Sequence, residues 1–184
     1  MRIDTQRLLL RPFEATDAAD LLAYRSGPLP TCFACRRLQG MEAARHEAEA
    51  LSRDGEYCLA IVCKADGRVI GEIGAHPEST APGEAPADTF SPCWMLNAAY
   101  QGHGYALEAA RAFFDYLFRV KGARRIYAYT EMDNHRSQRL CERLGMRREG
   151  VFVEFVSFVS NEDGTPRYED TIQYAILKRE WQDR

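Results

Sequence analysis

Two glycines and the residues around them offer the clearest chemistry in this chain. Gly102 and Gly104 follow the segment 91–100 and precede an alanine-rich run. Glycine permits a tight turn because it has no Cβ, and a helix that begins directly after the turn leaves its first N–H groups unpaired. Such N–H groups, at the positive end of a helix dipole, bind phosphate groups. The spacing therefore predicts an anion-binding turn between a strand and a helix, and an ordinary strand-to-helix connection is the alternative.

The residues of this turn exclude two common phosphate-binding patterns. A dinucleotide fingerprint needs a third glycine at position 107, which is Leu107, and a nucleoside-triphosphate loop needs Gly-Lys-Ser/Thr where the chain reads Gly104-Tyr105-Ala106. The pattern that remains is Gln-x-x-Gly-x-Ala over residues 101–106. It resembles the acyl-CoA pyrophosphate loop of the GNAT (Gcn5-related N-acetyltransferase) superfamily.

We expect the whole chain to form one cytoplasmic domain. With 184 residues and 46% hydrophobic side chains it is long enough for a single core, so we expect one domain over residues 1–184. A net charge of −3 gives no basic footprint for nucleic acid, and no apolar run approaches the roughly 20 residues of a membrane span. Six cysteines without a secretory signal predict reduced thiols. Cys32 and Cys35 lack the further ligands that a zinc site requires, so no metal is expected.

The elements that must position the turn follow from periodicity and turn signals. The alternation of strand-like and helix-like segments predicts an α/β (or α+β) fold with a mixed sheet covered by helices. The expected strands are 7–13, 57–64, 68–74, the segment from 91 to 97, 125–130, 151–159 and 171–177; the expected helices are 18–24, 41–53, the segment from 105 to 121, and 134–144. Residues 77–90 hold three prolines and predict a surface loop. Tyr127 and Tyr129 should share one sheet face, and we interpret both as core residues.

Further motifs strengthen the resemblance and extend it over most of the chain. Asn134-His-Arg-Ser137 and Leu144-Gly145-Met146 are similar to the superfamily's Asn-x-x-Ser and Leu-Gly-Phe signature, with Met146 where phenylalanine is common. Gly71-Glu-Ile-Gly74 fits the same pattern, and the segment from Glu149 to Trp181 resembles the branch of ribosomal-protein N-terminal (RimJ/RimL-like) acetyltransferases. The resemblance implies a mainly antiparallel twisted sheet of about seven strands flanked by about four helices.

The resemblance also implies a binding site for acetyl-CoA. Backbone amides of the turn would take the pyrophosphate, the strand before it would pair with the pantetheine arm, and the N–H of Leu96 would meet the thioester oxygen. Asn134 would hydrogen-bond the pantetheine arm, and Ser137 would lie near the sulfur as the proton donor. The implied cofactor-binding residues are Met95, Leu96, Asn97, Gln101, Gly102, His103, Gly104, Tyr105, Ala106, Asn134 and Ser137.

Two glutamates are candidates for the base that takes the proton of the attacking amine. Glu72 lies on a strand next to the expected cleft, and Glu154 is placed like a carboxylate used in the ribosomal branch. The alternative for each is a solvated side chain or an ion pair with arginine. With Ser137 they complete the candidate catalytic set.

These expectations describe an acetyl-CoA-dependent N-acetyltransferase that works by direct attack in a ternary complex. The acceptor is a primary amine, and a protein N-terminus, a polyamine and an aminoglycoside-like amine all stay open. A homodimer is also left open. The alternatives from other classes are a non-catalytic acyl-CoA-binding regulatory module on the same fold and a scaffold with a vestigial loop.

Overall fold

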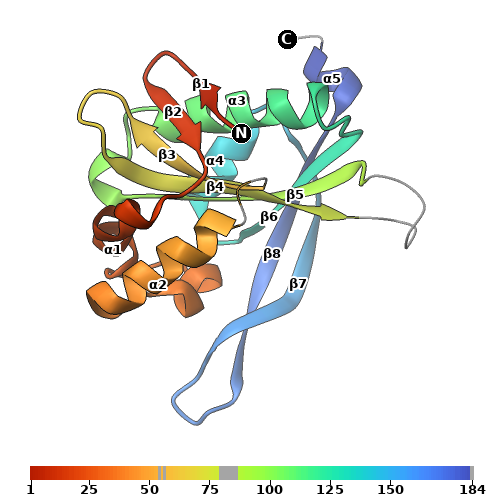
Figure 1. Ribbon diagram of the computed structural model, residues 1–184. Coiled ribbons are helices and arrows are strands. Elements are labelled where there is room, and N and C mark those ends of the chain that lie inside the picture. The colour runs from red at the N-terminus through yellow and green to blue at the C-terminus, as the bar shows by residue number, and fades with distance from the viewer. Residues whose placement is uncertain (54, 56, 79–86, 183–184) are drawn as a thin grey trace.

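The computed structural model describes residues 1–53, 55, 57–78 and 87–182, which form one sheet with helices on both faces (Figure 1). The strands are β1 (Ile3–Asp4), β2 (Leu8–Arg11), β3 (Cys58–Cys63), β4 (Val69–Glu78), β5 (Thr89–Leu96), β6 (Arg125–Glu131), β7 (Arg147–Ser160) and β8 (Pro166–Leu177). The α-helices are α1 (Ala18–Arg25), α2 (Gly40–Arg53), α3 (Tyr105–Arg119), α4 (His135–Arg143) and α5 (Lys178–Gln182). Short 3₁₀ turns are η1 (Ala15–Asp17), η2 (Thr31–Arg36) and η3 (Ala98–Tyr100). Among the described residues, no helix has the length and apolar character needed to cross a membrane.

The sheet has the order β1-β2-β3-β4-β5-β6-β8-β7, and every neighbouring pair is antiparallel except β5 and β6. This confirms the predicted mixed, mainly antiparallel sheet. The two-residue β1 brings the strands to eight, and the short α5 brings the α-helices to five, one more of each than expected. The predicted helices 18–24, 41–53 and 134–144 agree with α1, α2 and α4 to within one residue at each end.

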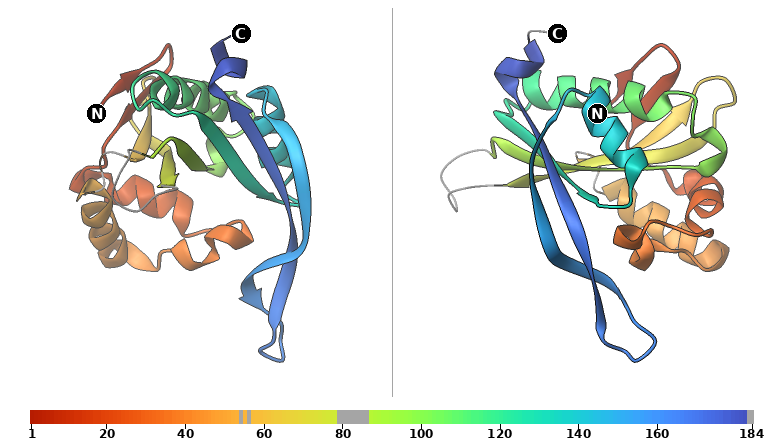
Figure 2. Two further views of the ribbon diagram at one scale, coloured as in Figure 1. Left: turned by 90° about the vertical axis from the view of Figure 1, so that its right-hand side faces the viewer. Right: turned by 180° about the vertical axis from the view of Figure 1, so that it is seen from behind.

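Two apolar clusters hold the helices to opposite faces of the sheet. α3 packs on one face through Ala110, Phe113 and Leu117, which are fully buried, and α4 lies beside it on the same face (Figures 1 and 2). α1 and α2 cover the other face through Leu21, Ala44 and Ala48. At roughly 25 cal/mol per Å² of buried apolar surface, these stripes are the main favourable contribution to the fold.

The loop expected over residues 77–90 is shorter than predicted at both ends. Pro77 and Glu78 belong to β4, where they pair with Phe90 and Thr89 of β5; residues 79–86 lie outside the described part of the chain. Opposed residues in an antiparallel strand pair alternate between hydrogen-bonded and non-hydrogen-bonded positions. Ile70 and Asn97 form a hydrogen-bonded pair, because the N–H of Asn97 donates to the carbonyl of Ile70. Pro77 therefore falls at a non-bonded position, where its missing N–H costs no ladder bond.

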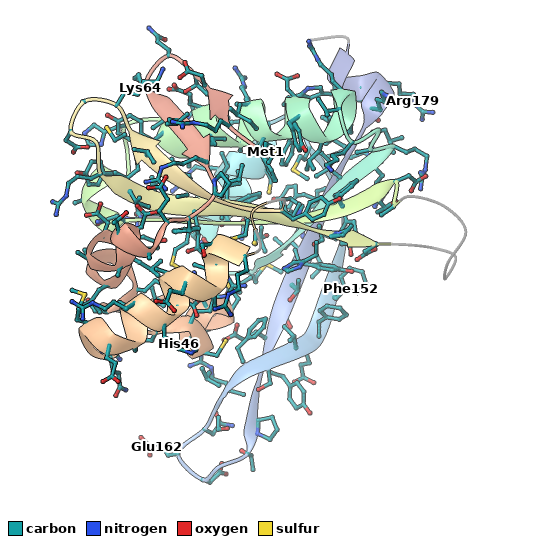
Figure 3. The ribbon with its side chains drawn as sticks, viewed as in Figure 1. Met1, His46, Lys64, Phe152, Glu162 and Arg179 are labelled. Atoms are coloured by element: carbon teal, nitrogen blue, oxygen red, sulfur yellow. The ribbon has the colours of Figure 1, made fainter. Side chains whose placement is uncertain are left out.

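The β7–β8 hairpin is longer than predicted and projects well beyond the helices (Figure 1), with Glu162 at its free end (Figure 3). Two bulges interrupt its outer pairing, between Phe152 and Val156 and between Ser157 and Val159. Tyr127 is buried as expected, but the prediction for Tyr129 is wrong because its side chain is 43% exposed and packs with Phe152 and Phe155 of this hairpin. The helices α1 and α2 do not extend over this part of the sheet (Figure 2).

Candidate active site

A gap between β5 and β6 opens a cavity in the protein. β5 pairs with β4 along its whole length but with β6 only at Thr89 and Phe90. Like Pro77, Pro92 lies at a position of the β4–β5 pair that makes no hydrogen bond between these two strands, so its backbone faces β6. Proline has no N–H to donate to β6. The two strands then part, and a cavity of about 810 Å³ opens beside Trp94, Met95 and Leu96.

The turn after β5 has the geometry of an anion site. Gly102 and Gly104 both have φ of +82°, a conformation that side chains with a Cβ rarely adopt, and α3 begins at Tyr105. Within the described chain, the backbone N–H groups of residues 102–107 donate to no acceptor, and the first bonded one in the helix is that of Glu108, to the carbonyl of Gly104. Free amides at a helix N-terminus fit a phosphate or pyrophosphate group.

Arg7, which no sequence motif singles out, anchors this turn to the start of β2. Its Nη1 donates to the carbonyl of His103 at 2.9 Å, and its Nε donates to Glu108 Oε2 at 2.7 Å. The guanidinium also lies 4.6 Å from the centre of the Tyr105 ring. The hydrogen bonds from Arg7 and Thr5 lower the pKa of Glu108 further than burial raises it. The turn is therefore held from outside while its amides stay free.

The backbone of Leu96 faces the gap. Because the N–H of Asn97 bonds to Ile70 of β4, the preceding N–H and carbonyl of Leu96 point away from β4. The carbonyl accepts a hydrogen bond from Gln101 Nε2 at 3.0 Å. The N–H of Leu96 points into the gap between β5 and β6. This is the orientation that a donor to a thioester oxygen requires.

Asn134 and Ser137 lie on the other side of the cavity. Asn134 caps α4 by accepting the backbone N–H of Ser137 at 3.2 Å, and its Nδ2 donates to Glu131 at 3.0 Å. Trp94 Nε1 on β5 donates to Ser137 Oγ at 3.1 Å. Because the hydroxyl accepts this bond, its own proton is available for donation to a further group.

Glu72 is 2% exposed and takes part in a buried ion-pair network. Its Oε2 accepts hydrogen bonds from Arg25 Nη2 at 2.6 Å and from Tyr24 at 2.9 Å, and its Oε1 accepts one from Arg36 at 3.1 Å. Burial, and then the charge of Glu72, raise the pKa of Tyr24 well above its usual value. The network joins α1, η2 and β4, so Glu72 has the arginine pairing that was its alternative role.

Glu154 is exposed and lies in the bulge of β7 between Phe152 and Val156. Its φ of +48° is the one positive value among the described residues other than glycine, and its backbone N–H donates to Asp170 Oδ1 at 2.8 Å. Its carboxylate forms no ion pair with any described residue. A strained backbone conformation of this kind costs of order 1–3 kcal/mol and often marks a functional position.

Glu131, at the end of β6, was not selected from the sequence. It is 6% exposed and accepts hydrogen bonds from Thr31 Oγ1 at 2.7 Å, from the N–H of Cys32 at 2.9 Å and from Asn134. Burial raises the pKa of this carboxyl, but the hydrogen bonds outweigh burial and lower the pKa overall. Glu131 thus connects η2 to the cap of α4. No local pattern reveals it, because Thr31 is 100 residues away in the chain.

Most of the predicted cofactor residues line the cavity together. They are Met95, Leu96, Gln101, Gly102, Gly104, Tyr105, Ala106, Asn134 and Ser137. Asn97 instead caps η3 through Ala99, and the His103 ring stacks on Tyr105. Glu72 and Glu154 are not among the lining residues, which on the opposite side include Tyr24, Leu29, Pro30 and Phe33. In the described ranges, no group of three or more His, Cys, Asp or Glu side chains is arranged to hold a metal ion.

Comparisons with known proteins place this chain in one family. Residues 7–147 match the acetyltransferase (GNAT) domain family. An uncharacterized N-acetyltransferase of Bacillus subtilis, YnaD, is 31% identical over 98% of this chain and 99% of its own. A GNAT-family acetyltransferase from Bacillus anthracis superposes with a TM-score of 0.82 at 28% identity, covering 98% of this chain and all of that one. The ribosomal-protein-S5-alanine acetyltransferase of Vibrio fischeri shares the fold, with a TM-score of 0.71 at 17% identity over 98% of both chains. The chain therefore belongs to the GNAT family of N-acetyltransferases.

Proposed function

We propose that this protein transfers an acetyl group from acetyl-CoA directly to a primary amine in a ternary complex. The observation that carries the proposal is the gap between β5 and β6, because it places free backbone donors, a turn with unpaired amides and the Ser137 hydroxyl around one cavity. Acetyl-CoA would supply the acetyl group as a thioester. Residues 102–107 would hold its pyrophosphate.

Two groups of the chain and the walls of the cavity would each contribute to acetyl transfer. The Leu96 N–H would stabilise negative charge on the carbonyl oxygen. The Ser137 hydroxyl, oriented by Trp94, would donate a hydrogen bond to the departing sulfur. The walls of the cavity hold the amine close to the carbonyl carbon, which lowers the entropic cost of the encounter.

Of the two candidate bases, Glu154 fits proton acceptance better than Glu72. Both oxygens of Glu72 already accept hydrogen bonds from guanidinium groups, so neither is free to accept a proton from an amine. Glu154 has no cationic partner among the described residues, and Phe152 and Phe155 on either side of it pack with Tyr129 on the sheet face that α1 and α2 leave open. We therefore assign Glu154 the role of base, and because it does not line the cavity it would act through water.

The lining of the cavity favours one acceptor class among three. The side opposite the turn is apolar, formed by Leu29, Pro30, Phe33 and Met95 with the ring of Tyr24, and the charged lining residues are all arginines. Polyamines and aminoglycosides carry several positive charges, which arginines repel and which no described carboxylate of the lining would balance. The amine is thus proposed to be that of a protein or peptide N-terminus beside a small or apolar side chain.

Thiol release from acetyl-CoA with a panel of amines tests this function. Peptides with a free N-terminal Ala, Ser or Met should be acetylated, whereas the same peptides with a blocked α-amine, spermidine and kanamycin should not. Turnover with the polycations and not with the peptides would contradict the acceptor assignment. Tight binding of acetyl-CoA by calorimetry with no turnover on any amine would instead support a non-catalytic CoA-binding module.

A further inference from the structure

The far part of the β7–β8 hairpin has no third strand beside it. β7 is the edge strand of the sheet, and β6 pairs with β8 only as far as Thr171. Residues 153–170, which we call the outer hairpin, therefore form a two-stranded ribbon that projects beyond the helices (Figures 1 and 2). A two-stranded hairpin without further packing is only marginally stable in water, which makes the outer hairpin a candidate contact surface.

Large apolar side chains are exposed along the outer hairpin. Val153 is 74% exposed, Phe158 43% and Tyr168 58%. Phe158 lies in the bulge between Ser157 and Val159, next to the strand pair of Ser157 with Tyr168. Exposed apolar patches mark interaction sites, and aromatic side chains are enriched in protein–protein interfaces. The exposed side chains of the outer hairpin thus favour a protein partner.

The charge of the outer hairpin differs from that of the rest of the chain. Five carboxylates against the single Arg167 give residues 153–170 a net charge of −4, and since the whole chain has −3, the remainder carries +1. Arg167 pairs with Glu169 at 2.8 Å. Glu162, at the free end (Figure 3), and Asp163 are exposed and form no ion pair with a described residue. The surface therefore attracts a positively charged partner.

We propose that the outer hairpin docks the body of the acceptor protein, at a surface where lysine or arginine side chains surround apolar ones. The inference rests on the proposed function, because it assumes that the acceptor amine is a protein N-terminus. The inner end of the outer hairpin lies beside the cavity, since Glu169 accepts a hydrogen bond at 2.9 Å from Thr31, and the adjacent Pro30 lines the cavity. One acceptor can therefore reach the cavity and the outer hairpin together.

The charge of the outer hairpin disfavours the other occupants of such a surface. Anionic lipid headgroups and nucleic acids would be repelled by it. A two-fold contact between hairpins of two copies of the chain would place two surfaces of net charge −4 against each other, which like-charge repulsion opposes. A basic protein surface instead gains from both the charge and the apolar side chains.

Three acceptor peptides with the same first four residues test the docking surface. The first ends there, and the second continues for about 12 residues of lysine and leucine, enough to follow a strand of the outer hairpin at about 3.3 Å per residue. The third has glutamate in place of each lysine. The lysine peptide should have a KM about 10- to 100-fold below that of the short peptide with a similar kcat, and the glutamate peptide should not. Fluorescence anisotropy with the lysine peptide blocked at its α-amine measures docking without turnover.

The double variant Glu162→Lys/Tyr168→Ser changes both the charge and the apolar surface of the outer hairpin, at positions that do not line the cavity. It should raise the KM of the lysine peptide to that of the short peptide and weaken binding of the blocked peptide by the same factor. Both kcat and KM for the short peptide should stay unchanged. Glu49→Lys/Val120→Ser is the matched control, because Glu49 is exposed on α2 and Val120 is 68% exposed at the end of α3; it should change neither.

The remaining outcomes separate the docking surface from the proposed function. Acetylation of all three peptides with equal KM, or unchanged values in the double variant, would exclude the docking surface and leave the proposed function intact. Binding of the blocked lysine peptide without acetylation of any free peptide would support docking and contradict the proposed function. A wild-type dimer that the double variant loses, measured by analytical ultracentrifugation, would assign the outer hairpin to a contact between copies, against the proposal.

Discussion

The two sides of the cavity are built in different ways. On the proposed cofactor side, the turn at 101–107 and the cap of α4 present backbone groups whose conformation depends on residues close in sequence, such as Asn134 with Ser137, and Arg7 holds the turn from β2. On the acceptor side, η2 is held by side chains that meet from distant segments: Arg36 with Glu72, and Thr31 with Glu131. The first side should therefore respond to changes in backbone conformation, and the second to the loss of single charged or polar side chains.

The largest expected effect is on the acceptor side, at Arg25. This side chain is fully buried and pairs with Glu72, which is 2% exposed, and with Glu47. Arg25→Met leaves Glu72 buried with one guanidinium instead of two. We expect the free energy of unfolding, measured by urea denaturation, to fall by about 3–5 kcal/mol.

The double variant Arg25→Met/Glu72→Met provides the control for this prediction. Replacement of a buried pair by apolar side chains of similar volume is often close to neutral, so the double variant should recover much of the lost stability. A loss below about 1 kcal/mol in the single variant would show that solvent reaches the network and that the acceptor side does not depend on it.

The next effect concerns catalysis on the cofactor side, at Ser137. Ser137→Ala removes the hydroxyl that accepts from Trp94 but keeps the backbone N–H that Asn134 caps, so α4 should remain intact. We expect kcat to fall about 100-fold, the lower end of the contribution of a general acid, with the affinity for CoA unchanged. Ser52→Ala on α2 is the control and should leave kcat unchanged. A change of less than about twofold in Ser137→Ala would remove the hydroxyl from the mechanism.

Gly104 tests the dependence of the cofactor side on backbone conformation. A β-branched residue at φ of +82° is strained by about 1–3 kcal/mol, and its Cβ would lie 3.4 Å from the Arg7 side chain. Gly104→Val should weaken CoA binding about 10- to 100-fold, measured by calorimetry. Gly164→Val, at the same φ within a degree but with no atom within 4 Å, should carry the same strain and leave CoA binding unchanged. Unchanged affinity in Gly104→Val would contradict the placement of the pyrophosphate.

The difference between the two sides of the cavity also explains which features can be predicted from the sequence. The ends of α1, α2 and α4 and the glycine turn follow from residues a few positions apart, so periodicity and turn chemistry locate them. Pro92 indicates the gap at the level of sequence, because a strand residue without an N–H cannot donate a hydrogen bond to the next strand. The effect of Pro92 depends, however, on which neighbouring strand it faces. Register with β4 decides that, and register is a property of two segments.

The acceptor side could not be predicted because its contacts are long-range. Arg25 and Glu72 are 47 residues apart, and neither has a local pattern that separates it from a solvated residue. The exposure of Tyr129 likewise depends on a hairpin that begins 18 positions later and on two helices that do not extend over it. The alternation of Tyr127 and Tyr129 predicts a shared face, and only the packing of the whole chain decides which part of that face is covered.

The smallest expected effect is at Thr31, where the acceptor side is sensitive to pH. Hydrogen bonds from Asn134, Cys32 and Thr31 hold the pKa of Glu131 below its usual value against the opposing effect of burial. A carboxyl whose pKa is lower in the folded state contributes stability above the unfolded pKa, about 4.3, and loses that contribution as the pH falls through the folded pKa. Thr31→Val removes one of these hydrogen bonds, together with the contact of the same hydroxyl to Glu169. We expect a loss of about 1 kcal/mol at pH 7. On acidification the variant should then lose less stability than the wild type, and this loss should be complete at a higher pH, because the pKa of Glu131 in the folded variant lies closer to its unfolded value.

Urea denaturation at pH 7 and at several values below pH 5 measures both parts of this prediction. Since the lost hydrogen bond favours the ionised carboxylate, the difference between Thr31→Val and the wild type should narrow once Glu131 is protonated in both. Thr165→Val is the matched control: it removes a hydroxyl that donates to Asp163 at 2.6 Å, but on the exposed hairpin, where water replaces the bond. If the difference in stability from the wild type changed equally with pH in both variants, Glu131 would be as well hydrated as Asp163. In that case η2 would not be held to β6 by a buried charge.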